Sequence, residues 1–140
     1  MAVLCAILIL AWMAGLTAID VRERRLPNIL TLPGAVLVAA GAVVCGHGVP
    51  ATVGAVALAG GYLVIHLISP AAMGAGDIKL ALGLGGLTGA FGVDVWLLAA
   101  LGAPMLTLAG GLLSRRRVLP HGPSMCLATV LAVALALSGR

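Results

Sequence analysis

Four of the 140 residues are acidic, and two of these, Asp20 and Asp77, stand directly beside long apolar runs. An ionisable side chain close to hydrocarbon is energetically costly, so each aspartate is a candidate functional group. Two carboxylates that lie close together cannot both ionise easily, and they share one proton. One carboxylate can then act as general base on a water molecule, while the protonated partner donates a hydrogen bond to a scissile carbonyl. If folding brings Asp20 and Asp77 together, they could form the catalytic pair of an aspartic protease.

Each aspartate also has an ordinary structural interpretation. Asp77 could be the N-cap of a helix that begins at Ile78, since Asp is a favoured capping residue. Asp20 could be a solvated helix end beside Arg24. The spacing of these residues does not choose between the catalytic and the structural interpretation.

The composition determines what kind of fold must position these groups. Hydrophobic residues make up 62% of the chain and charged residues 9%, against about 25% charged in a typical soluble domain, and the mean hydropathy is +1.23. A soluble fold could not cover its surface, so the chain is an integral membrane protein. With one Phe and one Tyr, the chain lacks the aromatic residues of a base-stacking nucleic-acid surface. The cysteines form no C-x-x-C pair, so we expect no metal site, and we expect no cofactor.

Apolar runs separated by charges and prolines predict an all-α, polytopic membrane protein, a bundle of about six transmembrane helices in one domain over residues 1–140. A membrane span needs about 20 apolar residues. Three of the six runs are long enough, the second is borderline, and the fourth and sixth are short. The runs are Met1–Ile19, Ile29–Cys45, Ala51–Ile68, Ile78–Phe91, Val95–Leu113 and Pro123–Leu137.

Charge asymmetry predicts the orientation of this bundle. With the N-terminus outside, the loops 20–28, 69–79 and 114–122 are cytoplasmic, and they hold seven of the eight basic residues, as the positive-inside rule expects. Asp20 and Asp77 then both lie at the cytoplasmic membrane face. The seven basic residues are Arg22, Arg24, Arg25, Lys79, Arg115, Arg116 and Arg117.

Small residues at a spacing of four predict close helix contacts, because lipid gives little hydrophobic drive for helices to associate. The fourth run carries Ala81, Gly85 and Gly89 at this spacing, and the third carries Ala57 and Gly61.

Three short motifs occur in order along the chain. Asp20 opens the run D-V-R-E-R-R-L-P-N-I-L-T, Asp77 lies in M-G-A-G-D-I-K-L, and L-P-H-G-P-S covers Leu119–Ser124. Together they resemble the type IV prepilin peptidases, membrane aspartyl proteases of the G-x-G-D class, in their compact form without a methyltransferase. His121 stands where the late P-F-G-P element of that family has Phe.

The resemblance implies an activity and a location. Asp20 and Asp77 would be the catalytic dyad, and the partners would be the lipid bilayer and a prepilin or pilin-like (Flp or pseudopilin) precursor. The basic leader would be cut at the cytoplasmic face of the bacterial inner membrane. The larger family members carry cysteine-based zinc motifs and also methylate the new N-terminus. Because this sequence has no such region, we expect peptidase activity alone.

Further residues around the motifs are expected to shape the site. Gly74 and Gly76 would let a substrate approach Asp77 closely. Lys79 would either lower the pKa of a neighbouring carboxylate or anchor the helix at the membrane interface. Pro27 and Asn28 would shape the start of the second helix, with Asn28 hydrogen-bonded near the site.

Two other functions fit the same residues. A small proton-coupled transporter or channel could use Asp20 and Asp77 as protonation sites. The chain could also be an inactive scaffold of a secretion or pilus machine, which would tolerate Asp-to-Asn changes. The pattern specifies no oligomeric state.

Overall fold

The computed structural model describes residues 1–114 and 119–139, and within these residues it contains six helices and no strand. This confirms the predicted all-α membrane bundle. Arg115, Arg116 and Arg117, which contribute to the predicted charge asymmetry, lie outside the described residues. The helices are α1 (Ala2–Glu23), α2 (Asn28–Val44), α3 (Gly48–Ile68), α4 (Ala75–Phe91), α5 (Val93–Ser114) and α6 (Gly122–Ser138).

The helix bounds follow the predicted apolar runs to within four residues. In the described part of the chain three segments are long and apolar enough to cross a membrane, namely Val3–Glu23, Gly48–Ile68 and Val93–Ser114. These are the three runs that the sequence predicts to be long enough. By contrast, α2 and α6 each have 17 residues, which is a length of about 25 Å against a hydrocarbon core of about 30 Å.

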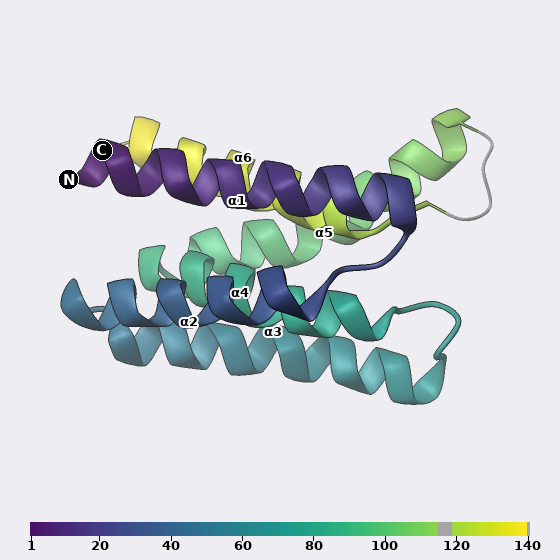
Figure 1. Cartoon of the computed structure of the whole chain (residues 1–140), viewed down its shortest axis with the longest axis horizontal. Helices are drawn as coiled ribbons and strands as arrows, with labels where there is room; N and C mark the ends of the chain where they lie inside the picture. The colour runs from purple at the N-terminus through teal and green to yellow at the C-terminus, as the bar shows by residue number, and fades with distance from the viewer. Residues whose placement is uncertain (115–118, 140) are drawn as a thin grey trace.

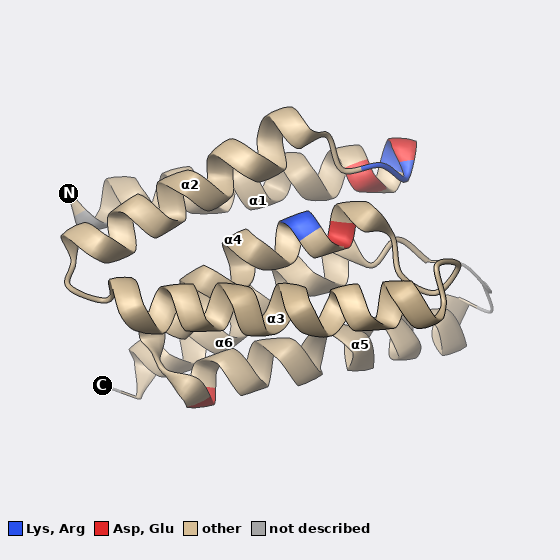
Figure 2. Cartoon of the chain, turned by 90° about the horizontal axis from the view of Figure 1, so that it is seen from below, with Lys and Arg blue, Asp and Glu red and all other residues tan. Residues whose placement is uncertain are grey.

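Consecutive helices run in opposite directions (Figure 1), so the ends of α1, α3 and α5 lie at the same end of the bundle as the starts of α2, α4 and α6. Among the described residues, the basic positions gather at this end, whereas the start of α5 places one acidic position at the other end (Figure 2). We call the end that carries the basic residues the charged end.

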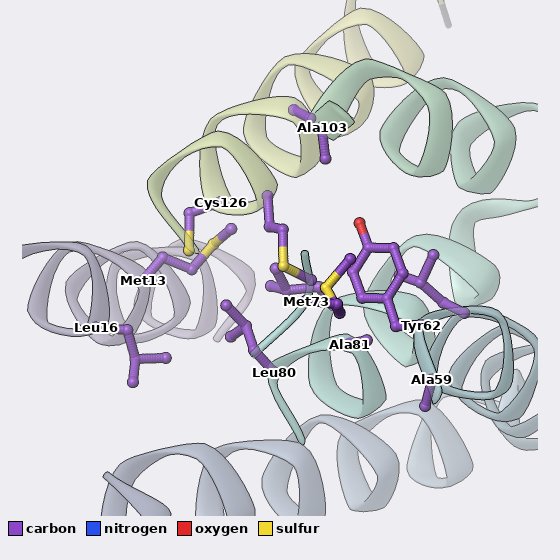
Figure 3. Close-up of a cluster of buried hydrophobic side chains, with 13 residues drawn as sticks. Met13, Leu16, Ala59, Tyr62, Met73, Leu80, Ala81, Ala103 and Cys126 are labelled. Atoms are coloured by element: carbon purple, nitrogen blue, oxygen red, sulfur yellow. The ribbon is translucent and has the colours of Figure 1, made fainter. Parts of the chain in front are cut away.

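The core of the bundle forms around α4, which packs against α2, α3, α5 and α6. Figure 3 shows the apolar side chains of several helices converging on this core. Leu80 and Leu84 of α4 are almost completely buried, together with Leu16 of α1 and Met125 of α6. The hydrophobic residues that point away from the core stay exposed in large numbers, as expected for helices that face lipid.

Glycines allow α3 and α4 to approach closely. A Cβ atom built on Gly85 would lie 2.6 Å from the carbonyl oxygen of Gly54, and one on Gly89 would lie 2.6 Å from that of Pro50. The predicted face of α4 is therefore confirmed. The predicted face of α3 is wrong, because Ala57 is exposed and Gly61 has open space beside it. The contact instead uses the face of α3 that carries Gly54, because this face meets the glycines of α4.

Helix α1 stands away from α4. Within the described residues, no Cα atom of α1 lies within 8 Å of a Cα atom of α4. The Trp12 side chain of α1 fills part of the space, with its ring against Gly34 of α2 and Gly83 of α4. Its Nε1–H donates a hydrogen bond to the Leu30 carbonyl at 2.8 Å. The side chains of α1, and not a close approach of its backbone, therefore make the link to α4.

Candidate active site

A cavity of about 310 Å³ lies between the end of α1 and the start of α4, at the charged end of the bundle. Both Asp20 and Asp77 line it. The structure thus brings to one place two aspartates that are 57 positions apart in the sequence. The residues that line the cavity are Asp20, Arg24, Arg25, Leu26, Gly74, Ala75, Gly76, Asp77 and Lys79.

The Asp20 side chain is held from the far end of the chain. Asp20 is 5% exposed, and its Oδ2 accepts a hydrogen bond from the backbone N–H of Gly122 at 3.1 Å. Gly122 is the first residue of α6, so its N–H is one of the amides that have no partner within the helix. Such an amide and the positive end of the helix dipole both favour a negative charge. The interpretation of Asp20 as a solvated helix end is therefore wrong.

Asp77 lies in the first turn of α4, ahead of the apolar run Ile78–Phe91. The helix begins at Ala75 with Gly74 as its N-cap, so the expectation that Asp77 itself is the cap is wrong. The Asp77 N–H donates to the Gly74 carbonyl at 3.1 Å, and the Gly74 N–H donates to Asp77 Oδ2 at 3.3 Å. Burial, together with the nearby charge of Asp20, raises the pKa of Asp77 to about 6.

The two glycines that flank this turn occupy crowded positions. A Cβ atom on Gly74 would lie 3.2 Å from Asp77 Oδ2, and one on Gly76 would lie 3.0 Å from the Leu26 Cβ atom. A side chain at either position would therefore require Asp77 or Leu26 to shift by a few tenths of an ångström. That these glycines let a substrate approach Asp77 closely stays a prediction.

Lys79 and Asn28 connect α4 to the start of α2. The Lys79 Nζ donates a hydrogen bond to Asn28 Oδ1 at 2.7 Å. Pro27 is the N-cap of α2, and its carbonyl accepts the N–H groups of Leu30 and Thr31. Lys79 lines the cavity, whereas Pro27 and Asn28 lie next to the residues that line it.

Two groups that support the site were not predicted from the sequence. One is the Gly122 amide that binds Asp20, for which the G-P step of the third motif is the only sequence signal. The other is His66, whose Nδ1 lies 2.7 Å from the carbonyl oxygen of Met73 and so holds the segment that precedes Gly74.

Carboxylates provide the acid–base groups of this cavity. In the part of the chain that the structure describes, no three or more His, Cys, Asp or Glu side chains form a cluster that could hold a metal ion. The arrangement offers Asp77 with a raised pKa beside Asp20, which receives an amide hydrogen bond. Two neighbouring carboxyl groups in unequal environments can divide the roles of acid and base.

Comparison with known proteins identifies the family to which the chain belongs. No curated protein and no solved structure gives a significant match to the chain. A model of the type IV leader peptidase family does match, over residues 7–137. Because this range spans nearly all of the 140 residues, the chain belongs to the type IV leader peptidase family.

Proposed function

We propose that this chain is a membrane aspartic endopeptidase, a single domain over residues 1–140 that removes the basic leader from type IV prepilin or pilin-like precursors. It acts at the cytoplasmic face of the bacterial inner membrane and has no N-methyltransferase activity. Family membership supports a leader peptidase. The observation that carries the aspartic mechanism is that Asp20 and Asp77, from helices far apart in the sequence, line one cavity at the charged end.

The surroundings of the two aspartates suggest a division of roles. Burial of the Asp20 carboxyl group opposes its ionisation, and the hydrogen bond that it accepts from the Gly122 N–H favours its ionisation. The pKa of Asp77 is raised to about 6, first by burial and second by the charge of Asp20. Because the charge of Asp20 is one cause of this shift, the singly protonated pair has the proton on Asp77 and the negative charge on Asp20.

This protonation state fits the hydrolysis of a peptide bond. The Asp20 carboxylate removes a proton from a water molecule, whose oxygen forms a bond to the scissile carbonyl carbon, while Asp77 gives its proton to the carbonyl oxygen. In the resulting gem-diol, Asp20 returns its proton to the amide nitrogen and the C–N bond breaks. A hydroxyl of the diol gives its proton to Asp77, which restores the starting state of the pair.

Co-expression with small pilin-like proteins tests this proposal. Wild type, Asp20→Asn and Asp77→Asn are compared, and removal of the leader is measured by gel shift and mass spectrometry. We expect cleavage by wild type and none by either variant, at equal protein levels in the membrane. The conservative replacement keeps the shape of the side chain and removes its ability to exchange a proton.

Other outcomes point to the other functions. Cleavage that survives either substitution contradicts the two-aspartate mechanism. A scaffold would support pilus assembly with Asn at both positions. A proton-coupled carrier would leave the leader intact and would show transport driven by a proton gradient. Family membership favours the peptidase over both.

A further inference from the structure

A chain of hydrogen bonds ties the start of α6 to α3 and α5. The ring of His121, the residue just before α6, lies between two hydroxyl groups. Its Nε2 is 3.1 Å from the Tyr62 hydroxyl of α3, and its Nδ1 is 2.7 Å from Thr107 Oγ1 of α5. The Tyr62 side chain is buried, and Figure 3 shows its hydroxyl directed toward the part of the cluster where Ala103 of α5 lies.

The hydrogens that these hydroxyl and ring groups carry determine the tautomer of His121 in which every contact is a hydrogen bond. The Ala103 carbonyl can only accept and the Thr107 hydroxyl has one proton, so both contacts of Thr107 Oγ1 are hydrogen bonds only when this proton goes to Ala103 at 3.0 Å and the His121 ring donates to Oγ1. Nδ1 must then carry a hydrogen. In a neutral ring Nε2 is the acceptor, and it receives the proton of the Tyr62 hydroxyl. A neutral ring is expected, because burial lowers the pKa of His121.

This arrangement has a direct connection to the carboxylate pair. The amide that follows His121 belongs to Gly122, and this amide is the hydrogen-bond donor to Asp20. The His121 carbonyl accepts the Met125 N–H at 3.0 Å, so the first turn of α6 is formed around the same residue. A displacement of the His121 backbone, which these two contacts to its ring resist, would therefore also move the Gly122 N–H relative to Asp20.

We propose that His121, as the neutral Nδ1–H tautomer, is a positioning residue that fixes the start of α6 between Tyr62 and Thr107 and thereby aims the Gly122 N–H at Asp20. This inference rests on the proposed function, since it assigns the contact to catalysis by Asp20. His121 does not touch the reacting atoms. Its effect is expected on the turnover rate and not on substrate binding.

The first test reads the tautomer directly. Nitrogen-15 NMR of the histidine-labelled protein, assigned by comparison with His121→Asn, is expected to show a neutral His121 ring at pH 7 with its hydrogen on Nδ1. In Thr107→Val the valine cannot accept this hydrogen bond, so the Nδ1 signal should shift. A hydrogen on Nε2, or a cationic ring at pH 7, overturns the proposal. This measurement needs no substrate and holds whether or not Asp20 is catalytic.

The second test measures cleavage of a pilin-like substrate. We expect Thr107→Val to lower kcat by about 10- to 100-fold, because a catalytic group displaced by about 1 Å costs on that order, with KM within about twofold of wild type. Thr107→Ser keeps the hydroxyl group and should restore kcat. Thr88→Val is the matched control, since Thr88 is a buried threonine of α4 whose hydroxyl, among the described residues, bonds only to the carbonyls of Leu84 and Gly85 in its own helix.

The outcomes separate this proposal from the proposed function. Wild-type kcat in Thr107→Val, or an equal loss in Thr88→Val, contradicts a positioning role for His121. Cleavage by Asp20→Asn contradicts the catalytic pair itself, whatever the result for Thr107. If Thr107→Val does not accumulate in the membrane, the tautomer in wild type and the kcat of Thr107→Ser decide the question.

Discussion

The contact between Gly122 and Asp20 leads to a prediction whose size follows from the structure. A Cβ atom built on Gly122 would lie 2.5 Å from Asp20 Oδ2 and 3.2 Å from its Cγ. An ordinary van der Waals contact begins near 3.4 Å. In Gly122→Ala the Asp20 carboxylate must therefore retreat by about 0.9 Å, to relieve the overlap with the new methyl group.

This displacement should impair catalysis more than folding. The atoms that must move belong to one carboxyl group, which can rotate toward the cavity, and no backbone has to separate. Displacement of a catalytic group by about 1 Å can cost about 100-fold in rate, so we expect kcat to fall by about 10- to 100-fold. The Gly122 N–H remains present but no longer reaches the displaced oxygen at 3.1 Å.

Initial rates of leader removal by purified protein in lipid nanodiscs measure this effect. Gly61→Ala is the matched control, because the same methyl group on α3 would enter open space. We expect the control to cleave like wild type. If Gly122→Ala cleaves within about twofold of wild type while Asp20→Asn is inactive, the Gly122–Asp20 hydrogen bond is not part of the catalytic geometry and the reasoning is refuted.

Three further predictions concern Asp77 and the α3–α4 contact. Burial, and then the charge of Asp20, raise the pKa of Asp77 to about 6. Above that pH, kcat/KM should fall about tenfold per pH unit, because the catalytic acid loses its proton. A kcat/KM that stays unchanged up to pH 8 would contradict this prediction. Between the ordinary aspartate pKa of 3.8 and the raised pKa of about 6, the folded state binds a proton that the unfolded state has lost, so the free energy of unfolding should decrease as pH rises through that window. Asp77→Asn should remove this pH dependence. At pH 7 it should raise the free energy of unfolding by at most about 3 kcal/mol, measured as a higher melting temperature. Gly85→Ala would place a Cβ atom 2.6 Å from the Gly54 carbonyl and should cost about 1–3 kcal/mol, measured as a lower melting temperature than that of Gly61→Ala.

Patterns that depend on one segment at a time could be predicted from the sequence. The six apolar runs correspond to the six helices of the described residues, because hydrophobic length and charged boundaries act locally. The positions of Asp20 and Asp77 at the charged end follow from the alternation of helix direction. That both line one cavity does not follow from spacing, and the motif resemblance supplied the expectation.

Features that depend on pairs of helices could not be predicted in the same way. The small residues of α3 occur on more than one face, so a spacing of four at Ala57 and Gly61 was as good a candidate as the face of Gly54. Which face is used depends on where the glycines of α4 lie in the assembled bundle. The same holds for Gly122, since an amide donor has no side-chain signal and its partner Asp20 is 102 residues away.

The separation of α1 from α4 shows why the cavity exists at all. Small residues draw α3 against α4, but α1 faces α4 with the large ring of Trp12, and glycine at positions 34 and 83 makes room for that ring. The ring lies two helical turns before Asp20 and keeps the backbone of α1 apart from α4. Two carboxylates on tightly packed helices would have no room between them for water and a peptide. The tryptophan and its two glycines therefore belong to the architecture of the site, although none of the three lines the cavity.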